Sequence, residues 1–507
     1  MIPSSNLRLL SGVNISPDNQ HTLYFDTQSA QSSFFEGRTQ HTINNMMVIK
    51  GGTKEKGVIK VEKSLNEIYN CNYLMFQNVG YSNKWFYAFI DEINYINDGN
   101  SEIVYHIDNL QTWFFEMRLE QCFVDREHTM NDTIGANLQP ESLEQGEYIF
   151  TDSGVFISPD EYNPRICIGA TVNSMGGKTA GGMYGNVYSG LDFHLFTVEQ
   201  ALDFIENVTD YNKADSIVSM NMVYSNFFPD KGESPKTYPR FIEKKYGDFD
   251  GYIPKNNKLY THPYNYLYVT TLDGNTAEFR YEFFEGENCE FLTVGTGGAN
   301  PSIQLIPVGY KNNGVVNVNE RMSLSGFPNC AYNIDSFKAW LAQNGGSTTF
   351  QTLASAGSVV AGVALAPATG GTSVAVGAVL GGLGVASSLA QVTANSAKPP
   401  QARGNSSASD LYALKFFNFH RYNTKITREY AEIIDLYFTK YGYKTNKLKI
   451  PNISGRKAFN YVKTIDSAIS GDLPMHSKQV INSIFNGGVT FWKSNSNIGN
   501  YNIDNTL

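Results

Sequence analysis

The sequence has 507 residues, of which 17% are charged and 13% are aromatic, and its formal net charge is −9. Ordinary soluble domains have about 25% charged residues, and disordered chains combine high charge with few aromatic residues. The composition therefore excludes a chain that is disordered throughout, and the net charge excludes a surface that binds nucleic acid over its whole extent. At this length we expect two to four domains rather than one core.

The N-terminal part of the sequence predicts β-structure. Residues 84–90 and 93–96 are rich in aromatic and β-branched side chains, which are typical of strands. They lead to Asp98-Gly99, and another run of this kind follows at 102–107. Because an Asp-Gly pair takes the positive φ angles that a tight turn needs, the pattern predicts a hairpin.

A second hairpin is predicted further along the chain, with a strand over 264–272 and a turn at Asp273-Gly274. Beyond the turn, aromatic side chains alternate with polar ones at Phe279, Tyr281 and Phe283. This alternation predicts a strand in a sheet that has one solvent-exposed face.

Helices are predicted to be few and short. Thr197 and Gln200 form a capping box ahead of an apolar run at 201–205. Thr427 is predicted to cap a second helix, which Gly442 ends. Its apolar face is predicted from the spacing of Tyr430, Ile433, Ile434, Tyr437 and Phe438. A third helix is expected over 477–487, and the fold class is therefore mainly β with a few helices (α+β).

The cysteines are scattered singly, at Cys71, Cys122, Cys167, Cys289 and Cys330. Their odd number and the lack of a C-x-x-C pair speak against a disulfide framework or a zinc ribbon. We expect all five to pack in the core. The N-terminal residues show no basic-then-apolar signal peptide, so we expect a chain that is made and folded in a reducing cytoplasm.

Two motifs resemble chemical sites, but we interpret both as structural. Gly176-Gly177-Lys178-Thr179 echoes a phosphate-binding loop, yet the glycine required five residues before Gly177 is replaced by Val172. Residues 125–128, Asp-Arg-Glu-His, gather charges without the further ligands that a metal or acid–base site needs. We expect a glycine-rich loop at the first and an ion-paired junction at the second. No catalytic, cofactor-binding or metal residue is assigned, and no cofactor is expected.

Lysines are interleaved with glutamates near the N-terminus, at Lys50, Lys54, Lys56, Lys60 and Lys63. We interpret them as the solvent-exposed face of a strand, with a DNA-binding patch as the less favoured alternative.

One segment differs from the rest of the chain, because residues 339–397 contain no Asp, Glu, Lys, Arg or His. It holds two apolar arms, 353–366 and 374–389, separated by a Pro- and Gly-containing reversal at 367–372. As helices the arms would span about 21 and 24 Å, less than the roughly 30 Å hydrocarbon core of a membrane. Conventional transmembrane anchors are therefore disfavoured. The large aliphatic residues of the arms are Leu353, Val359, Val360, Val363, Leu365, Val374, Val376, Val379, Leu380, Leu383, Val385 and Leu389.

Three structures remain open for this segment on its composition alone. It could form a buried helical hairpin, a hinged hairpin that enters a membrane, or a disordered loop. Small residues such as Ala, Gly and Ser allow close helix approach, as in membrane helix contacts. A buried core helix would instead use larger side chains that fill space.

Several phrases of the sequence, taken together and in order, resemble one protein family. They lie at 76–78, 83–90, 108–113, 123–129, 435–443, 449–452, 456–463, 471–474 and 485–492. The set is similar to the tail knob, or distal tail tube, proteins of small short-tailed bacteriophages (podoviruses) that infect Gram-positive hosts. The resemblance covers nearly the whole chain.

The resemblance implies a hexameric tube at the tail tip, built from β-barrel domains, through which genomic DNA passes. In related knobs, long apolar loops plug the tube and then swing out to breach the host membrane. The uncharged segment occupies the position of that loop, so the resemblance favours a membrane-penetrating hairpin. The candidate hinges are Gly345, Gly346, Pro399, Pro400 and Gly404.

We therefore expect a non-enzymatic structural protein of the virion tail tip, made in the host cytoplasm. The predicted domains are an N-terminal β tube domain (1–150), a middle β-rich domain (151–338), the apolar loop (339–404) and a C-terminal domain that completes the tube body (405–507). The expected partners are further copies of the chain in a homo-hexamer, other phage tail proteins, phage genomic DNA and the host cell membrane. The alternatives are a tail-associated enzyme that degrades the cell wall and a receptor-binding tail protein.

Overall fold

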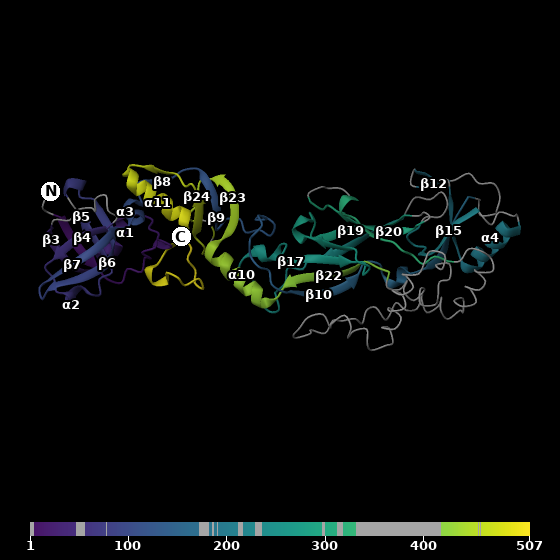
Figure 1. The fold of residues 1–507 in the computed structure, drawn as a ribbon, viewed down its shortest axis with the longest axis horizontal. Helices are drawn as coiled ribbons and strands as arrows, with labels where there is room; N and C mark the ends of the chain where they lie inside the picture. Colours follow the sequence, from purple (N-terminus) through teal and green to yellow (C-terminus); the bar gives the residue numbers. More distant parts are fainter. Residues whose placement is uncertain are drawn as a thin grey trace. The chain divides into compact units, whose positions relative to one another are not determined.

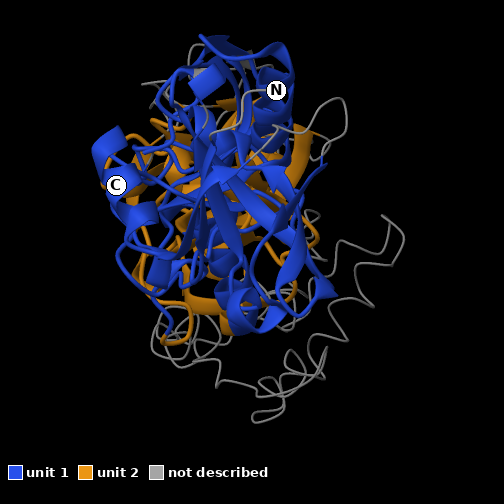
Figure 2. Ribbon diagram, turned by 90° about the vertical axis from the view of Figure 1, so that its left-hand side faces the viewer, with its two compact units in different colours: residues 1–144, 252–259, 429–507 blue, residues 145–251, 260–428 orange. Residues whose placement is uncertain are grey.

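The computed structural model describes the chain with one long gap and several short ones. The described residues are 5–46, 56–77, 79–171, 182–184, 187–189, 191–210, 216–228, 236–296, 300–311, 318–330, 417–454, 456 and 458–507. They form two compact units (Figure 2). Unit 1 comprises Met1–Glu144, Tyr252–Leu259 and Glu429–Leu507, and unit 2 comprises Gln145–Gly251 and Tyr260–Arg428. Each unit is therefore assembled from segments that lie far apart in the sequence. The division into four domains at 150, 338 and 404 stays a prediction.

The fold is mainly β, as the sequence predicts (Figure 1). The described part of the chain contains twenty-six strands and six α-helices. Among these residues no helix is both long enough and apolar enough to cross a membrane.

Unit 1 contains three sheets, in the strand orders β3-β1-β5-β6-β7-β4, β2-β26-β24-β9-β23 and β25-β8. Its strands are β1 (Ser5–Leu10), β2 (His21–Leu23), β3 (Thr39–Met46), β4 (Lys56–Val61), β5 (Tyr73–Gln77), β6 (Trp85–Asn97), β7 (Asn100–Ile107), β8 (Met117–Leu119), β9 (Cys122–Glu127), β23 (Tyr443–Lys449), β24 (Tyr461–Ile465), β25 (Ile469–Gly471) and β26 (Val489–Trp492). Its helices are α1 (Gln28–Glu36), α2 (Leu65–Ile68), α3 (Asn109–Trp113), α10 (Arg428–Tyr441) and α11 (Met475–Gly487). Side chains of α3, α11 and both large sheets share one apolar core.

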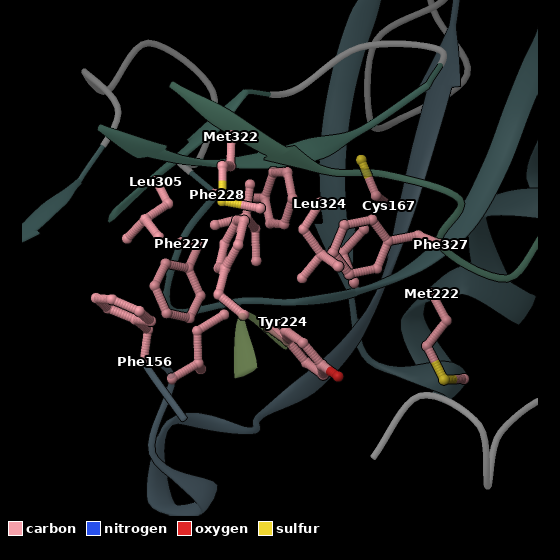
Figure 3. Packing of buried hydrophobic residues seen from close by; sticks show 14 of the residues in the cluster. Phe156, Cys167, Met222, Tyr224, Phe227, Phe228, Leu305, Met322, Leu324 and Phe327 are labelled. Carbon is pink, nitrogen blue, oxygen red and sulfur yellow. The ribbon is translucent and has the colours of Figure 1, made fainter. Parts of the chain in front are cut away.

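Unit 2 contains four sheets, in the strand orders β10-β22-β17-β18, β14-β11-β15, β12-β13 and β16-β19-β20-β21. Its strands are β10 (Tyr148–Val155), β11 (Pro164–Ala170), β12 (Gly182–Tyr184), β13 (Val187–Ser189), β14 (Asp192–Phe196), β15 (Ile217–Tyr224), β16 (Thr237–Glu243), β17 (Asn265–Thr270), β18 (Thr276–Phe279), β19 (Asn288–Thr296), β20 (Ser302–Val308), β21 (Met322–Leu324) and β22 (His420–Ile426). Helix α4 (Val198–Asp210) packs on β11 and β14. Figure 3 shows part of the core of this unit, which is dense in aromatic side chains.

Both predicted hairpins are present. Strands β6 and β7 pair on either side of Asp98-Gly99, with Asn97 opposite Asn100. The two predicted runs at 84–90 and 93–96 form one continuous strand, which contains a bulge between Ile90 and Glu92. A bulge keeps a long strand paired while changing its twist, so the intervening polar residues do not break it.

The predicted strand over Phe279, Tyr281 and Phe283 is wrong beyond its first residue. Strand β18 ends at Phe279, and Tyr281–Phe283 form a 3-10 turn. The Tyr281 side chain is fully buried, and its hydroxyl donates to Oδ1 of Asn423 at 2.8 Å. This buried hydrogen bond favours the turn over the extended strand that the period-two alternation predicts.

The three predicted helices are present as α4, α10 and α11. In α4 the capping box is closed, because the Gln200 N–H donates to Thr197 Oγ1 at 3.2 Å and the Thr197 N–H donates to Gln200 Oε1 at 2.9 Å. Helix α10 begins directly after Thr427, and the Gly442 N–H donates to the Phe438 carbonyl at its end.

The predicted apolar face of α10 is buried only in part, at Ile434 and Phe438. The buried residues are Ala431, Ile434, Asp435, Phe438 and Thr439, whereas Ile433 is 58% exposed. At 100° per residue the buried face is turned by roughly a quarter turn from the apolar spacing. The helix is turned because it buries the Asp435 carboxylate, which makes hydrogen bonds inside unit 1, in place of its most apolar side.

That carboxylate, Asp435, binds the short segment 252–259 of unit 1. The Tyr252 hydroxyl donates to it at 2.6 Å, and the backbone N–H groups of Lys255 and Asn256 donate at 2.8 and 3.0 Å. The Asn256 amide adds a further hydrogen bond at 2.8 Å. Asp435 is 1% exposed, so these donors replace the water that the buried carboxylate has lost.

We predict that Asp435→Ala destabilises unit 1 by about 3 kcal/mol, because it leaves two backbone N–H groups and a hydroxyl without their acceptor. The free energy of unfolding can be measured by urea titration followed by far-UV circular dichroism. Asp203→Ala, an exposed aspartate on α4, is the matched control and should change stability by less than about 0.5 kcal/mol. Equal effects of the two substitutions would contradict the role assigned to Asp435.

Candidate functional site

The apolar loop predicted over residues 339–404, which contains the uncharged segment 339–397, lies outside the described residues, as do all of its aliphatic positions and the five candidate hinges, Gly345, Gly346, Pro399, Pro400 and Gly404. Gly176-Gly177-Lys178-Thr179 also lies outside them. The described chain stops at Cys330 before the segment and resumes at Phe417 after it, and both residues belong to unit 2. These two points form the base of the segment.

The two sides of the base are held against the same strand, β15. On the first side the Cys330 N–H donates to the Met220 carbonyl at 2.8 Å, and the Met222 N–H donates to the Pro328 carbonyl at 2.9 Å. On the second side the Tyr224 hydroxyl donates to the Phe417 carbonyl at 3.4 Å. The described residues that precede and follow the segment are therefore both held beside one strand.

Aromatic rings join the two sides directly. The ring of Phe327 lies 5.7 Å from that of Phe417, and the Tyr224 ring lies 5.7 Å from Phe327. Tyr162 stacks on Tyr224 with a centroid distance of 4.8 Å. Figure 3 shows Tyr224 and Phe327 together in this cluster. The ends of the segment are thus part of the core of unit 2.

Asn418 fixes the return of the chain. The Ile157 N–H donates to its Oδ1 at 3.0 Å, and its amide donates to the Ile157 carbonyl at 2.8 Å. The amide also lies 2.6 Å from the Tyr162 hydroxyl. Asn418 is 1% exposed, and strand β22 begins two residues later between β10 and β17. Sequence reasoning missed this residue, since a single buried Asn carries no periodic pattern.

The Asp-Arg-Glu-His motif of residues 125–128 is an ion-paired junction, as predicted. Arg126 contacts Glu141 at 2.6 Å, Glu127 pairs with Lys449, and Asp125 lies 3.4 Å from Lys463. Strand β9 ends at Glu127, so His128 follows the strand.

Glu141 links three segments of unit 1 and was not singled out by the sequence. Its carboxylate accepts from Arg126 and from Lys258, each at 2.6 Å, and from the Lys444 N–H at 2.9 Å. Burial alone raises the pKa of Glu141, but the positive charges of Lys258 and Arg126 outweigh burial and hold this pKa below its ordinary value. The ionised carboxylate, shared by two cations and a backbone N–H, holds the three segments together.

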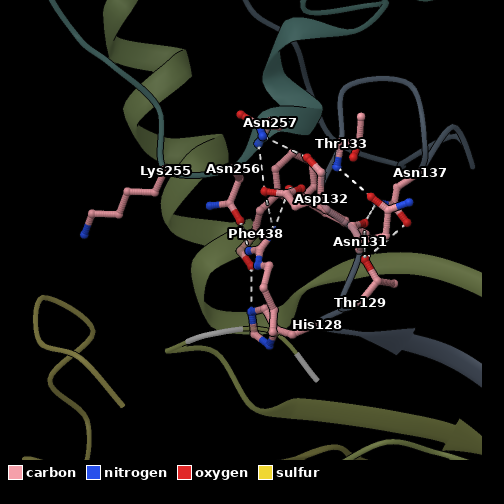
Figure 4. Close-up of polar contacts among 12 residues, drawn as sticks. His128, Thr129, Asn131, Asp132, Thr133, Asn137, Lys255, Asn256, Asn257 and Phe438 are labelled. Carbon is pink, nitrogen blue, oxygen red and sulfur yellow. Dashed lines mark hydrogen bonds and ion pairs between the residues drawn. The ribbon is translucent and has the colours of Figure 1, made fainter. Parts of the chain in front are cut away.

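The neighbouring polar contacts close the same junction (Figure 4). Asp132 accepts from Arg456 at 2.7 Å and from the Asn257 N–H at 3.3 Å. The Asn257 amide donates to the Asp132 carbonyl at 2.8 Å. Within the described ranges no group of three or more His, Cys, Asp or Glu residues could hold a metal ion. The cluster joins segments of unit 1 that lie far apart in the sequence.

His128 bridges α10 and β24 with both ring nitrogens. Nε2 lies 3.1 Å from the Phe438 carbonyl, and the Tyr461 N–H donates to Nδ1 at 2.9 Å. These partners require a neutral ring with its proton on Nε2. Burial, reinforced by the charge of Arg456, lowers the pKa of His128 to about 3.

Three of the lysines near the N-terminus are described, of which Lys63 lies beyond β4 and pairs with Glu67 at 2.9 Å. Lys56 and Lys60 are exposed on β4, where they alternate with buried residues that include Ile59 and Val61. Lys50 and Lys54 lie outside the described residues. The interpretation as a solvated face is confirmed for β4.

All five cysteines are buried and none is in a disulfide, which confirms their predicted place in the core.

Comparison with known proteins identifies the family. Residues 226–506, more than half of the chain, match the family described as Bacillus phage phi29, tail knob protein gp9, C-terminal domain. The chain belongs to this tail knob family. Residues 3–118 also match the family described as the caudoviral major tail protein N-terminus. The chain is therefore a structural component of the virion tail, and the family is one of structural proteins rather than enzymes.

Relatives cover the chain from end to end. Tail knob protein gp9 of Bacillus phage phi29 is 27% identical and that of Bacillus phage PZA is 28% identical, each over 100% of this chain and 99% of the relative. The solved structure of the bacteriophage C1 tail knob protein, gp12, has a TM-score of 0.60 and 15% identity, with 98% of both chains covered. This likeness shows that the two proteins share a fold.

We predict that acid weakens unit 1 through His128. The unfolded chain binds a proton on this histidine near its ordinary pKa of 6.5, whereas the folded chain binds one only near pH 3. Stability is therefore lost as the pH falls below 6.5, at about 1.4 kcal/mol per pH unit, or about 2 kcal/mol at pH 5. Urea titrations between pH 7 and pH 5 measure the loss.

His128→Gln should remove most of this pH dependence, because glutamine does not titrate. His476→Gln on α11 is the matched control, since His476 is exposed, and should leave the pH dependence unchanged. If the free energy of unfolding of His128→Gln still falls by the full ~2 kcal/mol at pH 5, groups other than His128 cause the loss.

We predict that a cut within the uncharged segment leaves the chain assembled. A protease site inserted between Gly370 and Gly371 would separate β22 from the preceding strands covalently, but β22 stays paired with β10 and β17. The cleaved protein should elute as one species on native size exclusion and run as two fragments on a denaturing gel. A C-terminal fragment that elutes alone would show that the base does not hold the chain.

Proposed function

We propose that copies of this chain form a hexameric tube at the tail tip through which the phage genome leaves. Membership of the tail knob family and the match of residues 3–118 to a major tail protein family support this proposal. The mainly β units and the low charge of the chain also suit subunits that bury their flanks in a ring. A ring of this kind needs contacts between copies and with other tail proteins.

The uncharged segment is the proposed membrane-active part. Before infection, segments from neighbouring copies would bury their aliphatic side chains against one another and plug the lumen. After release, the same apolar surface would favour lipid over water. Each arm is too short to span a bilayer alone, but several arms together could line a pore, because neighbours satisfy their exposed polar groups.

The observation that carries this proposal is the combination of an uncharged stretch at 339–397 with a fixed base. Phe327, which precedes the segment, and Phe417, which follows it, lie close together, with their ring centroids 5.7 Å apart. A segment anchored in this way can change its environment without unfolding the unit that carries it. The hinge residues proposed from the sequence lie between this base and the apolar arms.

The net charge fits a conduit for DNA. Each copy contributes a net charge of −9, and an acidic lumen repels phosphate and lets the duplex slide without binding. The receptor-binding alternative stays a prediction. Membership of a family of structural, non-enzymatic proteins speaks against the cell-wall-degrading alternative.

Deleting residues 351–397 in favour of a short Gly/Ser linker should abolish leakage of a fluorescent dye from liposomes, because the apolar arms are gone. A length-preserving variant, Val363→Asp with Val379→Asp, should also lose leakage, because each charge costs several kcal/mol in hydrocarbon. Both proteins should melt at the wild-type temperature, since the base of the segment is intact. Unchanged leakage in both variants would overturn the membrane-active role.

A further inference from the structure

One face of the sheet β10-β22-β17-β18 in unit 2 is covered with aromatic rings. The strand register places Tyr422 opposite Tyr268, and Thr424 opposite both Phe150 and Tyr266. Directly opposed residues share a sheet face, and so do alternate residues of one strand. Five rings therefore lie on one face, and we call them the aromatic platform: Tyr148, Phe150, Tyr266, Tyr268 and Tyr422.

The aromatic platform lies on the outer face of this sheet. Leu267, Val269 and Phe279 point to the other face, where they belong to the core of unit 2 and are at most 2% exposed. On the platform, Phe150 is 50% exposed and Tyr266 is 7% exposed. The other three rings have intermediate exposure, so the platform is a surface that a ligand can reach.

The rings of the platform hold one another in place. The Phe150 ring lies 5.9 Å from that of Tyr268 and 5.8 Å from that of Tyr422, and Tyr148 lies 5.9 Å from Tyr266. Side chains that are already packed lose little rotamer freedom when a ligand binds, which favours affinity. Among the described residues, no hydrogen-bond partner is found for the four tyrosine hydroxyls of the platform.

The charge of this face selects the class of ligand. The other described residues that the register puts on it are Val155, Thr270, Thr276, Glu278, His420, Thr424 and Ile426. Glu278 is thus the only Asp, Glu, Lys or Arg among them, and its carboxylate lies 3.2 Å from Nε2 of His262. Arg421 and Lys425 alternate with these residues on β22 and point to the other face.

The border of the platform is mainly acidic. The charged residues that flank its strands in the sequence are Glu147, Asp152, Asp273 and Arg280. Arg280, the one cation, packs on the ring of Phe283 at 5.1 Å, and Asp152 pairs with Arg421 and Lys245. A nucleic acid or another phosphate polymer needs a basic surface, so the charge of this face speaks against it.

The size of the platform speaks against a protein partner. The rings span three strands, or about 10 Å across the sheet, and two positions along a strand, or about 7 Å. With the width of the rings added, the platform covers roughly 200 Å², whereas each partner in a specific protein complex buries about 800 Å². The platform therefore fits a small ligand.

We propose that the aromatic platform binds a neutral oligosaccharide. A sugar ring has a face of C–H groups, which stacks on an aromatic ring, and a rim of hydroxyls, which meets tyrosine hydroxyls and a carboxylate such as Glu278. An organic cation is normally enclosed by rings, whereas these rings lie on neighbouring strands of one sheet face. The platform belongs to a single copy of the chain and needs neither the ring of copies nor the membrane-active segment.

A glycan array of neutral and phosphate-containing bacterial cell-wall oligosaccharides tests this proposal with the full-length protein. The wild type should bind neutral members and no phosphate-containing ones. Phe150→Ser and Tyr422→Ser, made singly, should each weaken the binding of a neutral oligosaccharide by roughly tenfold in a calorimetric titration, because each removes a stacking ring. Tyr422→Phe keeps the ring and loses one hydroxyl, so it should weaken binding only by about threefold.

Phe241→Ser is the matched control, because Phe241 is 61% exposed on β16 of another sheet and should not affect binding. Melting temperatures equal to that of the wild type show that the variants fold. If no member of the array binds, or if phosphate-containing members bind instead, the proposed ligand is wrong. Binding that survives both Phe150→Ser and Tyr422→Ser lies elsewhere and overturns the platform. A change in oligomeric state with Phe150→Ser but not with Phe241→Ser would make this face a contact between copies, which also overturns it.

Discussion

Much of unit 1 depends on the hydrogen bonds between the buried carboxylate of Asp435 and the segment 252–259. The carboxylate holds this segment, which reaches unit 1 from between two stretches of unit 2 in the sequence. Two of the donors are backbone N–H groups, and the Tyr252 hydroxyl and the Asn256 amide add two side-chain donors, so both the backbone and the sequence of this segment take part. Lys258, in the same segment, then completes the ion network around Glu141.

The same carboxylate decides what unit 1 shows to solvent. A helix oriented by its apolar spacing would bury Ile433, but α10 buries Asp435 and turns Ile433 outward. The exposure of Ile433 is therefore a consequence of the hydrogen bonds that Asp435 makes on the other side of the helix. Because α10 is one rigid helix, the burial of Asp435 also decides that Ile433 is exposed to solvent.

Local patterns predicted the elements well, and they failed where tertiary contacts decide. The Asp98-Gly99 hairpin and the capping box of Thr197 and Gln200 depend on neighbouring residues, and both are present. The turn at Tyr281 depends on Asn423, far away in the sequence, and was missed. Likewise Glu141 and Asn418 could not be singled out, since their partners come from distant segments. The lack of charge at 339–397 identified the unusual segment. Its base could not be predicted, because Phe327, Tyr224 and Phe417 come together only in the folded structure.

The two sides of that base differ in how they would bear a mechanical load. The C-terminal side continues into β22, which is bonded to β10 on one edge and to β17 on the other, so a pull along the strand loads two ladders at once. The N-terminal side is held near Cys330 by an isolated bridge between Asn221 and Asn329 and a few backbone hydrogen bonds on β15. A force applied to the segment would therefore separate residues 328–330 from β15 first, while β22 stays paired with β10 and β17.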